Sequence, residues 1–188
     1  MNAKSRPQRL AVPPQPTDHL SGALHARVTL IEYGDFQCPS CKSAAPTPKL
    51  MLERFPNKML FIFRHFPLED AHAHALLAAE AAEAAASQGK FWEMHDLLFL
   101  HQPRLEGRDL QRYAAEIGLD MVRYHAEMDD HIYLQKVREH IDGGRRSHVR
   151  ATPAFFVDGI GQDASYGMQP LHEAVADAVK RAEVGPAD

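Results

Sequence analysis

The most informative segment of the chain, residues 28–41, reads VTLIEYGDFQCPSC. Its first six residues are rich in β-branched and aromatic side chains and end at Gly34-Asp35, which predicts a buried strand over Val28–Tyr33. After a short loop come Cys38 and Cys41, the two cysteines of the chain. This spacing is typical of a redox pair, and it is also compatible with half of a metal site, because thiolates serve in both.

The residues after Cys41 predict a helix and a second strand. Residues 42–55 place apolar side chains at helical spacing, with a kink at Pro46 and Pro48. Residues 58–63 read KMLFIF and predict another buried strand. A strand, a helix and a strand in this order form a right-handed unit with parallel strands. The cysteine pair then lies at the carboxyl end of the first strand, where the helix begins.

The rest of the chain divides into a helical block over residues 68–148 and a closing strand pair. Within the block, helical periodicity covers residues 71–88, 91–100, 109–117, 121–128 and 132–141. After it, Ala154–Val157 predicts a strand, Asp158-Gly159 a turn, and the residues around 164–166 a short second strand. An amphipathic helix over residues 169–182 completes the order β-α-β, helical block, β-β-α.

The composition excludes two kinds of partner. The 188 residues carry 21 Lys and Arg against 25 Asp and Glu, a formal net charge of −4, so nucleic acid is not an expected partner. No apolar run approaches the roughly 18 residues that a membrane helix needs, so no membrane partner is expected either. With 45% hydrophobic residues, the chain can fill the core of one domain.

The first 17 residues are predicted to form an extended tail ahead of one domain over residues 18–188. Four prolines within residues 7–16 favour an extended, solvated conformation. The basic start lacks the apolar segment of a signal peptide. If Met1 is the natural start, we therefore expect a cytoplasmic protein, in which a purely structural disulfide is disfavoured.

Four phrases in this order make the chain resemble the DsbA-like branch of the thioredoxin fold, which carries an inserted helical domain. They are EYGDFQCPSC at residues 32–41, FRHFPL at 63–68, GKFWEMHD at 89–96 and VRATPAFFVDG at 149–159. The resemblance covers about residues 17–182. It implies an α/β thioredoxin fold with a mixed central sheet and the helical insertion at about 68–148.

The resemblance also implies thiol:disulfide oxidoreductase activity on protein or peptide thiols and disulfides. A thiol redox partner would recycle the enzyme. No cofactor and no metal are expected, because the redox-active Cys38–Cys41 disulfide itself carries the electrons. Whether the chain oxidises or reduces its substrates stays open at this stage.

Cys38 is the expected nucleophile and Cys41 the expected resolving cysteine. A helix start favours the thiolate form of Cys38, which is expected to lower its pKa below that of an ordinary thiol. Cys41 lies about one helical turn further on the same face, within reach of a disulfide. Pro39 and Ser40 are expected to tune the reduction potential of the Cys38–Cys41 pair. DsbA-like oxidants commonly carry His at the position of Ser40, so we expect a less oxidising pair here.

Three further residues are assigned roles at the site. The family places a buried acid at Glu32, which would act as proton relay to Cys41 with a pKa raised by desolvation; the alternative is that Glu32 faces solvent at a strand end. Thr152 and Pro153 are expected to bind substrate, through a cis Thr152–Pro153 bond packed against the cysteines. The alternative for Pro153 is an ordinary trans proline before a strand.

Two other functions compete with this interpretation. The same cysteine pair could serve a non-catalytic redox-sensing or metal-binding module. A glutathione-linked transferase or isomerase is disfavoured, because those thioredoxin-fold relatives usually keep one Ser or Cys rather than the pair. The histidines are interpreted as scaffold, since His72 and His74 on a helix would face different sides and make no metal pair.

Overall fold

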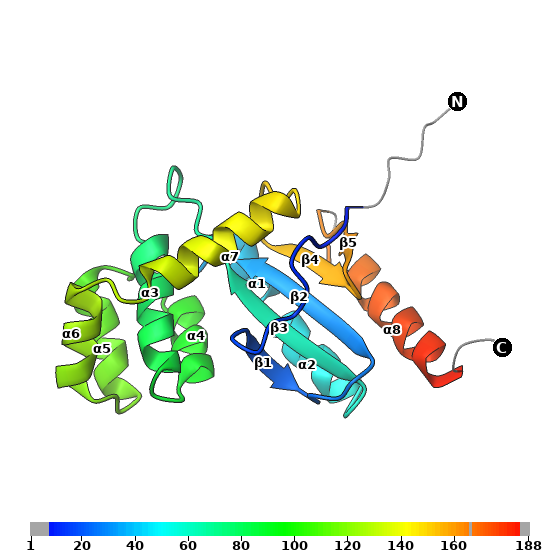
Figure 1. Cartoon of the computed structure of the whole chain (residues 1–188), viewed down its shortest axis with the longest axis horizontal. Coiled ribbons are helices and arrows are strands. Elements are labelled where there is room, and N and C mark those ends of the chain that lie inside the picture. The colour runs from blue at the N-terminus through cyan, green and yellow to red at the C-terminus, as the bar shows by residue number, and fades with distance from the viewer. Residues whose placement is uncertain (1–7, 166, 185–188) are drawn as a thin grey trace. The chain divides into compact units, whose positions relative to one another are not determined.

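The computed structural model describes residues 8–165 and 167–184 and contains a five-stranded mixed sheet (Figure 1). The strand order is β1-β3-β2-β4-β5. β1 pairs antiparallel with β3, β4 with β2, and β5 with β4, whereas β2 and β3 run in the same direction. The strands are β1 His19–Gly22, β2 Val28–Gly34, β3 Met59–His65, β4 Ala154–Val157 and β5 Ile160–Gln162.

The chain forms two compact units. The sheet unit comprises Met1–Tyr33, Pro46–Arg64 and Gly143–Asp188, and the helical unit comprises Gly34–Ala45 and His65–Asp142. In the sheet unit, α8 (Gln169–Val184) packs against β4 and β5. The buried apolar residues of this unit include Leu30 and Ile31 on β2, Phe156 on β4, and Leu171 and Val175 on one stripe of α8.

The helical unit is built around α3 (Ala75–Ala86), which contacts α4, α5 and α6. Eight of its twelve residues are alanine, and the small side chains let the neighbouring helices approach closely on all sides. The other helices that lie wholly or partly in this unit are α1 Pro39–Ala44, α4 Phe91–Leu100, α5 Gly107–Glu116, α6 Met121–Asp129 and α7 Leu134–Arg146.

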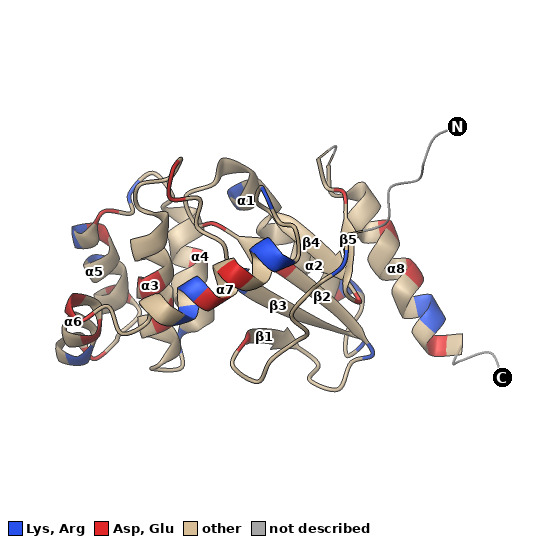
Figure 2. Ribbon diagram, turned by 45° about the horizontal axis from the view of Figure 1, so that its top comes forward, with Lys and Arg blue, Asp and Glu red and all other residues tan. Residues whose placement is uncertain are grey.

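Basic and acidic side chains occur together on α5, α6 and α8, as Figure 2 shows for each helix. Such mixing is typical of solvated helix faces rather than of a surface built for one charged partner. Among the described residues, no helix combines the length and the apolar character that a bilayer crossing demands.

The closing hairpin differs from the predicted one. The turn lies at Asp158-Gly159 as predicted, but β5 is Ile160–Gln162 and begins directly after it, so the prediction of a strand around residues 164–166 is wrong for 164 and 165; Tyr166 lies outside the described residues. Asp158 and Gly159 have φ angles of 48° and 76°. Positive φ at both central residues defines a two-residue type I′ turn, which pairs Val157 with Ile160 at once.

The N-terminal segment is attached to the sheet unit from residue 8 onward, whereas residues 1–7 of the predicted tail lie outside the described residues. The Leu10 amide donates to the Gly159 carbonyl oxygen at 2.9 Å, and the Gly161 amide donates to the Gln8 carbonyl oxygen at 2.8 Å. Arg9 forms a bridge with Ile160. The described part of the predicted tail is therefore tied down by backbone hydrogen bonds, although residues 13–17 are exposed.

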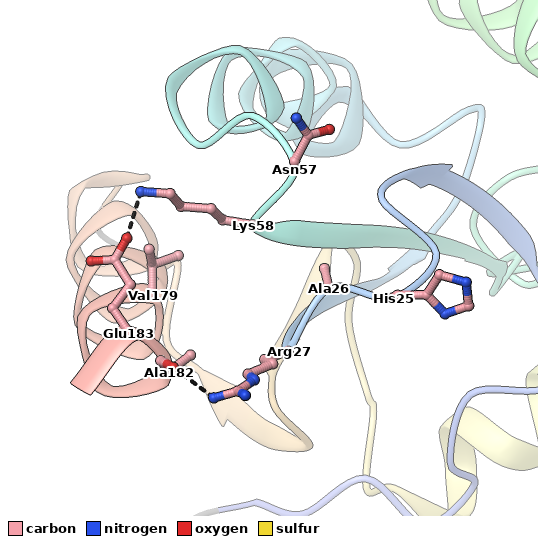
Figure 3. A pocket seen from close by; sticks show the side chains of 8 residues that line it. All are labelled: His25, Ala26, Arg27, Asn57, Lys58, Val179, Ala182 and Glu183. Atoms are coloured by element: carbon pink, nitrogen blue, oxygen red, sulfur yellow. Dashed lines mark hydrogen bonds and ion pairs between the residues drawn. The ribbon is translucent and has the colours of Figure 1, made fainter. Parts of the chain in front are cut away.

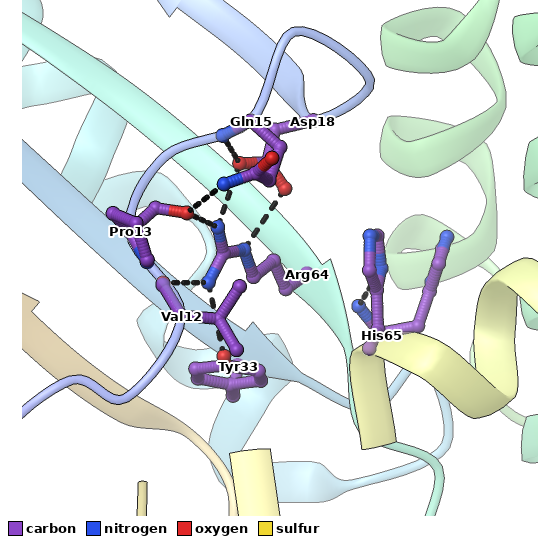
Figure 4. A network of polar contacts seen from close by, with 8 residues as sticks. Val12, Pro13, Gln15, Asp18, Tyr33, Arg64 and His65 are labelled. Carbon is purple, nitrogen blue, oxygen red and sulfur yellow. Dashed lines mark hydrogen bonds and ion pairs between the residues drawn. The ribbon is translucent and has the colours of Figure 1, made fainter. Parts of the chain in front are cut away.

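A buried arginine on β3 fastens the next part of this segment (Figure 4). The Arg64 guanidinium donates two hydrogen bonds to the Asp18 carboxylate, at 2.9 and 2.7 Å. It also donates to the carbonyl oxygens of Val12 and Pro13, both at 2.8 Å, and to the Tyr33 hydroxyl at 3.1 Å. The side chains of Arg64 and Asp18 are each 2% exposed, so the ion pair is shielded from water.

Candidate active site

The two cysteines lie where the sequence predicts, at the start of a helix. Cys38 is the N-cap residue of α1, with extended backbone angles (φ −75°, ψ 121°), and Pro39 is the first helical residue. The Lys42 amide donates to the Cys38 carbonyl oxygen at 3.1 Å and closes the first turn. Cys41 therefore follows Cys38 by one helical turn.

The predicted helix over residues 42–55 is two helices in the structure. α1 ends at Ala44, and α2 covers Pro46–Arg54. Pro46 has no amide hydrogen to continue the helical ladder, and its ring crowds the carbonyl four residues earlier. The Ala45 amide still bonds to the Cys41 carbonyl oxygen at 2.8 Å. The cysteine pair thus sits on a separate six-residue helix.

The two sulfur-bearing residues differ in burial. Cys38 keeps 7% of its surface exposed, whereas Cys41 is 0% exposed. The Asp35 backbone amide donates to the Cys41 sulfur at 3.5 Å. Both cysteines are thus buried, and the small exposed surface belongs to Cys38, which is the asymmetry that a nucleophile and a resolving thiol need.

The loop before Cys38 is held from one side by the turn at residues 68–72. The carboxylate of Asp35 is buried and accepts hydrogen bonds from the Gln37 amide at 2.7 Å and the Leu68 amide at 2.8 Å. It also accepts from His72 Nδ1 at 2.7 Å. All these groups belong to the helical unit.

The same loop is held from the other side by the end of α4. Gln102 Nε2 donates to the carbonyl oxygens of Phe36 and Cys38, both at 2.9 Å. Lys42 Nζ donates to the Leu100 carbonyl oxygen at 3.3 Å. These bonds give the carbonyl oxygens of Phe36, Cys38 and Leu100 a hydrogen-bond donor. The loop that carries Cys38 is therefore held by the residues after α4 as well as by the turn at residues 68–72.

An aromatic cluster forms around Phe36 of this loop. The Phe36 ring is 1% exposed and lies 5.0 Å from the Phe99 ring and 5.7 Å from the His95 ring, centroid to centroid. Burial lowers the pKa of His95, and the hydrogen bond to Asp96 opposes that shift without cancelling it. His95 is therefore neutral at pH 7 and packs as one more ring of the cluster.

The other sequence-predicted site residues belong to the sheet unit. Glu32 lies on β2, is 1% exposed and pairs in register with Phe155 on β4, which excludes the alternative that it faces solvent. Thr152 is 8% exposed. The Thr152–Pro153 peptide bond is cis. The structure thus groups Cys38, Cys41, Pro39 and Ser40 on one loop and helix of the helical unit.

The sequence interpretation missed the side chains that support the site. Asp35 stands inside the most informative segment, but nothing in the sequence shows what its carboxylate binds. His72 was expected on a helix beginning at residue 71, as scaffold. The structure begins α3 at Ala75, so that His72 belongs to the preceding turn and contacts Asp35. Gln102 has no signal of its own in the sequence.

A hollow of about 180 Å³ in the sheet unit is a separate feature (Figure 3). Lys58 and Glu183 form an ion pair across it, and Arg27 donates to the Ala182 carbonyl oxygen at 3.0 Å. None of the sequence-predicted site residues lines it. Its lining residues are His25, Ala26, Arg27, Asn57, Lys58, Val179, Ala182 and Glu183.

Comparison with known proteins gives a family match over most of the chain. The family model described as thioredoxin matches residues 14–177. Among solved structures, oxidised BdbD from Bacillus subtilis has a TM-score of 0.77 at 23% identity, covering 86% of this chain and 92% of that one. A thioredoxin-like oxidoreductase from Silicibacter pomeroyi DSS-3 has a TM-score of 0.70 at 26% identity, covering 91% and 95%.

The curated relatives carry a different name and are much longer. The Na(+)/H(+) antiporter NhaA 1 of Salinispora arenicola is 43% identical over 180 residues, which are 95% of this chain and 28% of that protein. The protein of the same name from Mycolicibacterium vanbaalenii is 41% identical over 160 residues, 84% of this chain and 26% of that protein. The chain thus spans about a quarter of the length of these relatives.

Proposed function

The chain belongs to the thioredoxin family, and from this premise we propose that it is a thiol:disulfide oxidoreductase acting on protein or peptide thiols through Cys38 and Cys41. The observation that carries the proposal is the unequal burial of the two cysteines at the start of α1. The antiporter activity in the name of the curated relatives is that of the longer proteins and is not assigned to this chain.

The proposed reaction needs no cofactor beyond the cysteine pair. In reduction, the Cys38 thiolate attacks a substrate disulfide, forms a mixed disulfide and releases one substrate sulfur as a thiolate. Cys41 then attacks the Cys38 sulfur, the Cys38–Cys41 disulfide forms, and the second substrate sulfur leaves with its electron pair. The reverse sequence oxidises a dithiol. In both directions a second thiol couple restores the starting state.

Three residues of the sheet unit keep their roles as part of this proposal. Glu32 serves as proton relay to Cys41, supported by the burial of its carboxylate on an otherwise apolar strand. Thr152 and Pro153 bind the substrate backbone, supported by the family match over this segment.

The proposal is tested with the intact chain in the insulin assay, in which dithiothreitol reduces insulin and the separated chains precipitate. We expect the chain to accelerate the appearance of turbidity in proportion to its concentration. Prior alkylation of the chain with iodoacetamide should remove the acceleration. A rate equal to that of dithiothreitol alone at every concentration of the unmodified chain would contradict the proposal.

The exposed residue Ser40 is expected to keep the cysteine pair from being strongly oxidising. Replacing it by His places a partial positive charge near the Cys38 sulfur, which stabilises the thiolate and hence the reduced form. Ser40→His should raise the reduction potential by about 30 mV, since 30 mV corresponds to about 1.4 kcal/mol for a two-electron couple.

The potential is measured by equilibration with glutathione buffers at pH 7, acid quenching and mass spectrometry. Ser43→His is the matched control, because Ser43 is an exposed serine near the end of the same helix, where the helix dipole no longer favours an anion. A potential that is unchanged in Ser40→His, or shifted equally in both variants, contradicts the role assigned to Ser40.

A further inference from the structure

A buried hydrogen-bond network joins Asp35, in the loop before Cys38, to the turn at residues 68–72. One Asp35 oxygen accepts from both the Leu68 amide, at 2.8 Å, and His72 Nδ1, at 2.7 Å. The Asp35 side chain is 0% exposed, and that of His72 is 18% exposed. The His72 amide in turn donates to the Leu68 carbonyl oxygen at 2.9 Å, so the turn presents two donors to one carboxylate oxygen.

The same residue also contacts the buried sulfur. The backbone amide of Asp35 donates to Cys41 Sγ at 3.5 Å. Its carboxylate is fixed by three donors, counting the Gln37 amide at 2.7 Å, and this leaves the residue little freedom to rotate. The direction of the Asp35 backbone N–H bond therefore depends on the groups that donate to the Asp35 carboxylate. Among these donors, His72 contributes the one side-chain group that a substitution can remove.

We propose that Asp35 and His72 are positioning residues that hold the Asp35 amide against the Cys41 sulfur and thereby speed the resolving step. The inference deepens the proposed function and rests on it. An amide hydrogen bond to the sulfur stabilises the Cys41 thiolate, which is the attacking form.

The resolving step exchanges one disulfide bond for another. The Cys41 thiolate attacks the Cys38 sulfur of a mixed disulfide and forms the Cys38–Cys41 bond. The bond between Cys38 and the substrate sulfur breaks, and the substrate leaves as a thiolate with the electron pair. With oxidised glutathione as the disulfide, the first step releases one glutathione and this step releases the second.

The test separates the two steps with glutathione as the probe. Reduced protein is mixed with oxidised glutathione, quenched in acid at intervals and analysed by mass spectrometry for the Cys38–glutathione adduct and its decay. In His72→Ala we expect adduct decay to slow about tenfold, as for loss of a hydrogen bond to a buried charged group. The rate at which iodoacetamide alkylates Cys38 should change less than about twofold, because the carbonyl of Cys38 is held by Gln102.

Three variants make the result specific. His72→Asn should restore most of the decay rate, since the Asn side-chain amide can place a donor near the position of Nδ1. Asp70→Ala is the control, an exposed side chain in the same turn, and should behave like the wild type. Asp35→Asn keeps the size of the side chain but loses one acceptor oxygen, and it should slow the same step if His72→Ala fails to fold.

Several outcomes would overturn the inference while leaving the proposed function intact. They are adduct decay at the wild-type rate in His72→Ala, equal slowing in His72→Ala and Asp70→Ala, and equal slowing of decay and of Cys38 alkylation. A wild-type chain that oxidised glutathione converts neither to the Cys38–glutathione adduct nor to the Cys38–Cys41 disulfide contradicts the proposed function itself, and the inference falls with it.

Discussion

Replacing Cys38 by Ser is expected to reduce insulin reduction to the background of dithiothreitol alone, a loss of more than about a hundredfold. A hydroxyl is not ionised at neutral pH and forms no disulfide, so neither the attack nor the mixed disulfide is available. No other cysteine can replace it, because Cys41 is fully buried. Turbidity at 650 nm, measured at equal concentrations of folded protein, provides the comparison.

Cys41→Ser is the matched variant for this experiment. It keeps the attacking sulfur and removes the resolving one, so it should accumulate a mixed disulfide between Cys38 and the insulin chain that mass spectrometry detects. Cys38→Ser should accumulate none. Equal insulin reduction by the wild type and Cys38→Ser would sink the catalytic assignment and favour the redox-sensing alternative.

Replacing Arg64 by Met is expected to lower the free energy of unfolding by about 3–5 kcal/mol. The substitution removes the guanidinium and leaves the Asp18 carboxylate charged, buried and without its bidentate partner. It also leaves the carbonyl oxygens of Val12 and Pro13 without their side-chain donor. Urea unfolding followed by the fluorescence of Trp92 measures the change.

Lys58→Met is the control for this loss. Lys58 also forms an ion pair in the sheet unit, with Glu183, but the two side chains are 49% and 52% exposed. Removing an exposed pair should cost less than about 1 kcal/mol. A change below that value for Arg64→Met, or equal changes in the two variants, would show that the buried network contributes no net stability.

The fold class and the cysteine site could be predicted from the sequence because their signals are local. The mixed sheet and the thioredoxin fold are confirmed, and Cys38 lies at the start of a helix as expected. β1 was missed because its four residues, HLSG, show no alternation of apolar and polar side chains. Its strand conformation is fixed by pairing with β3, which is a contact with a distant segment.

The support of the site could not be predicted for a similar reason. Residues 71–74 read AHAH and continue into an alanine-rich helix, so their local preference is helical. In the structure this turn binds the Asp35 carboxylate instead, 37 positions away from His72. A hydrogen bond over that separation leaves no trace in composition or periodicity. The local sequence is thus enough to identify the reactive sulfurs. The side chains that hold their loop in place are brought there by tertiary contacts.

The bridge between Arg9 and Ile160 has a consequence for self-association. β5 is the last strand of the sheet order, and an outermost strand with open backbone groups is a template for pairing with another chain. The Gly161 amide donates to the Gln8 carbonyl oxygen, and the Leu10 amide donates to the Gly159 carbonyl oxygen, so these backbone groups at the outer edge are already paired. A shortened chain that begins after Leu10 would expose this edge, and it should form aggregates at concentrations at which the intact chain remains monodisperse.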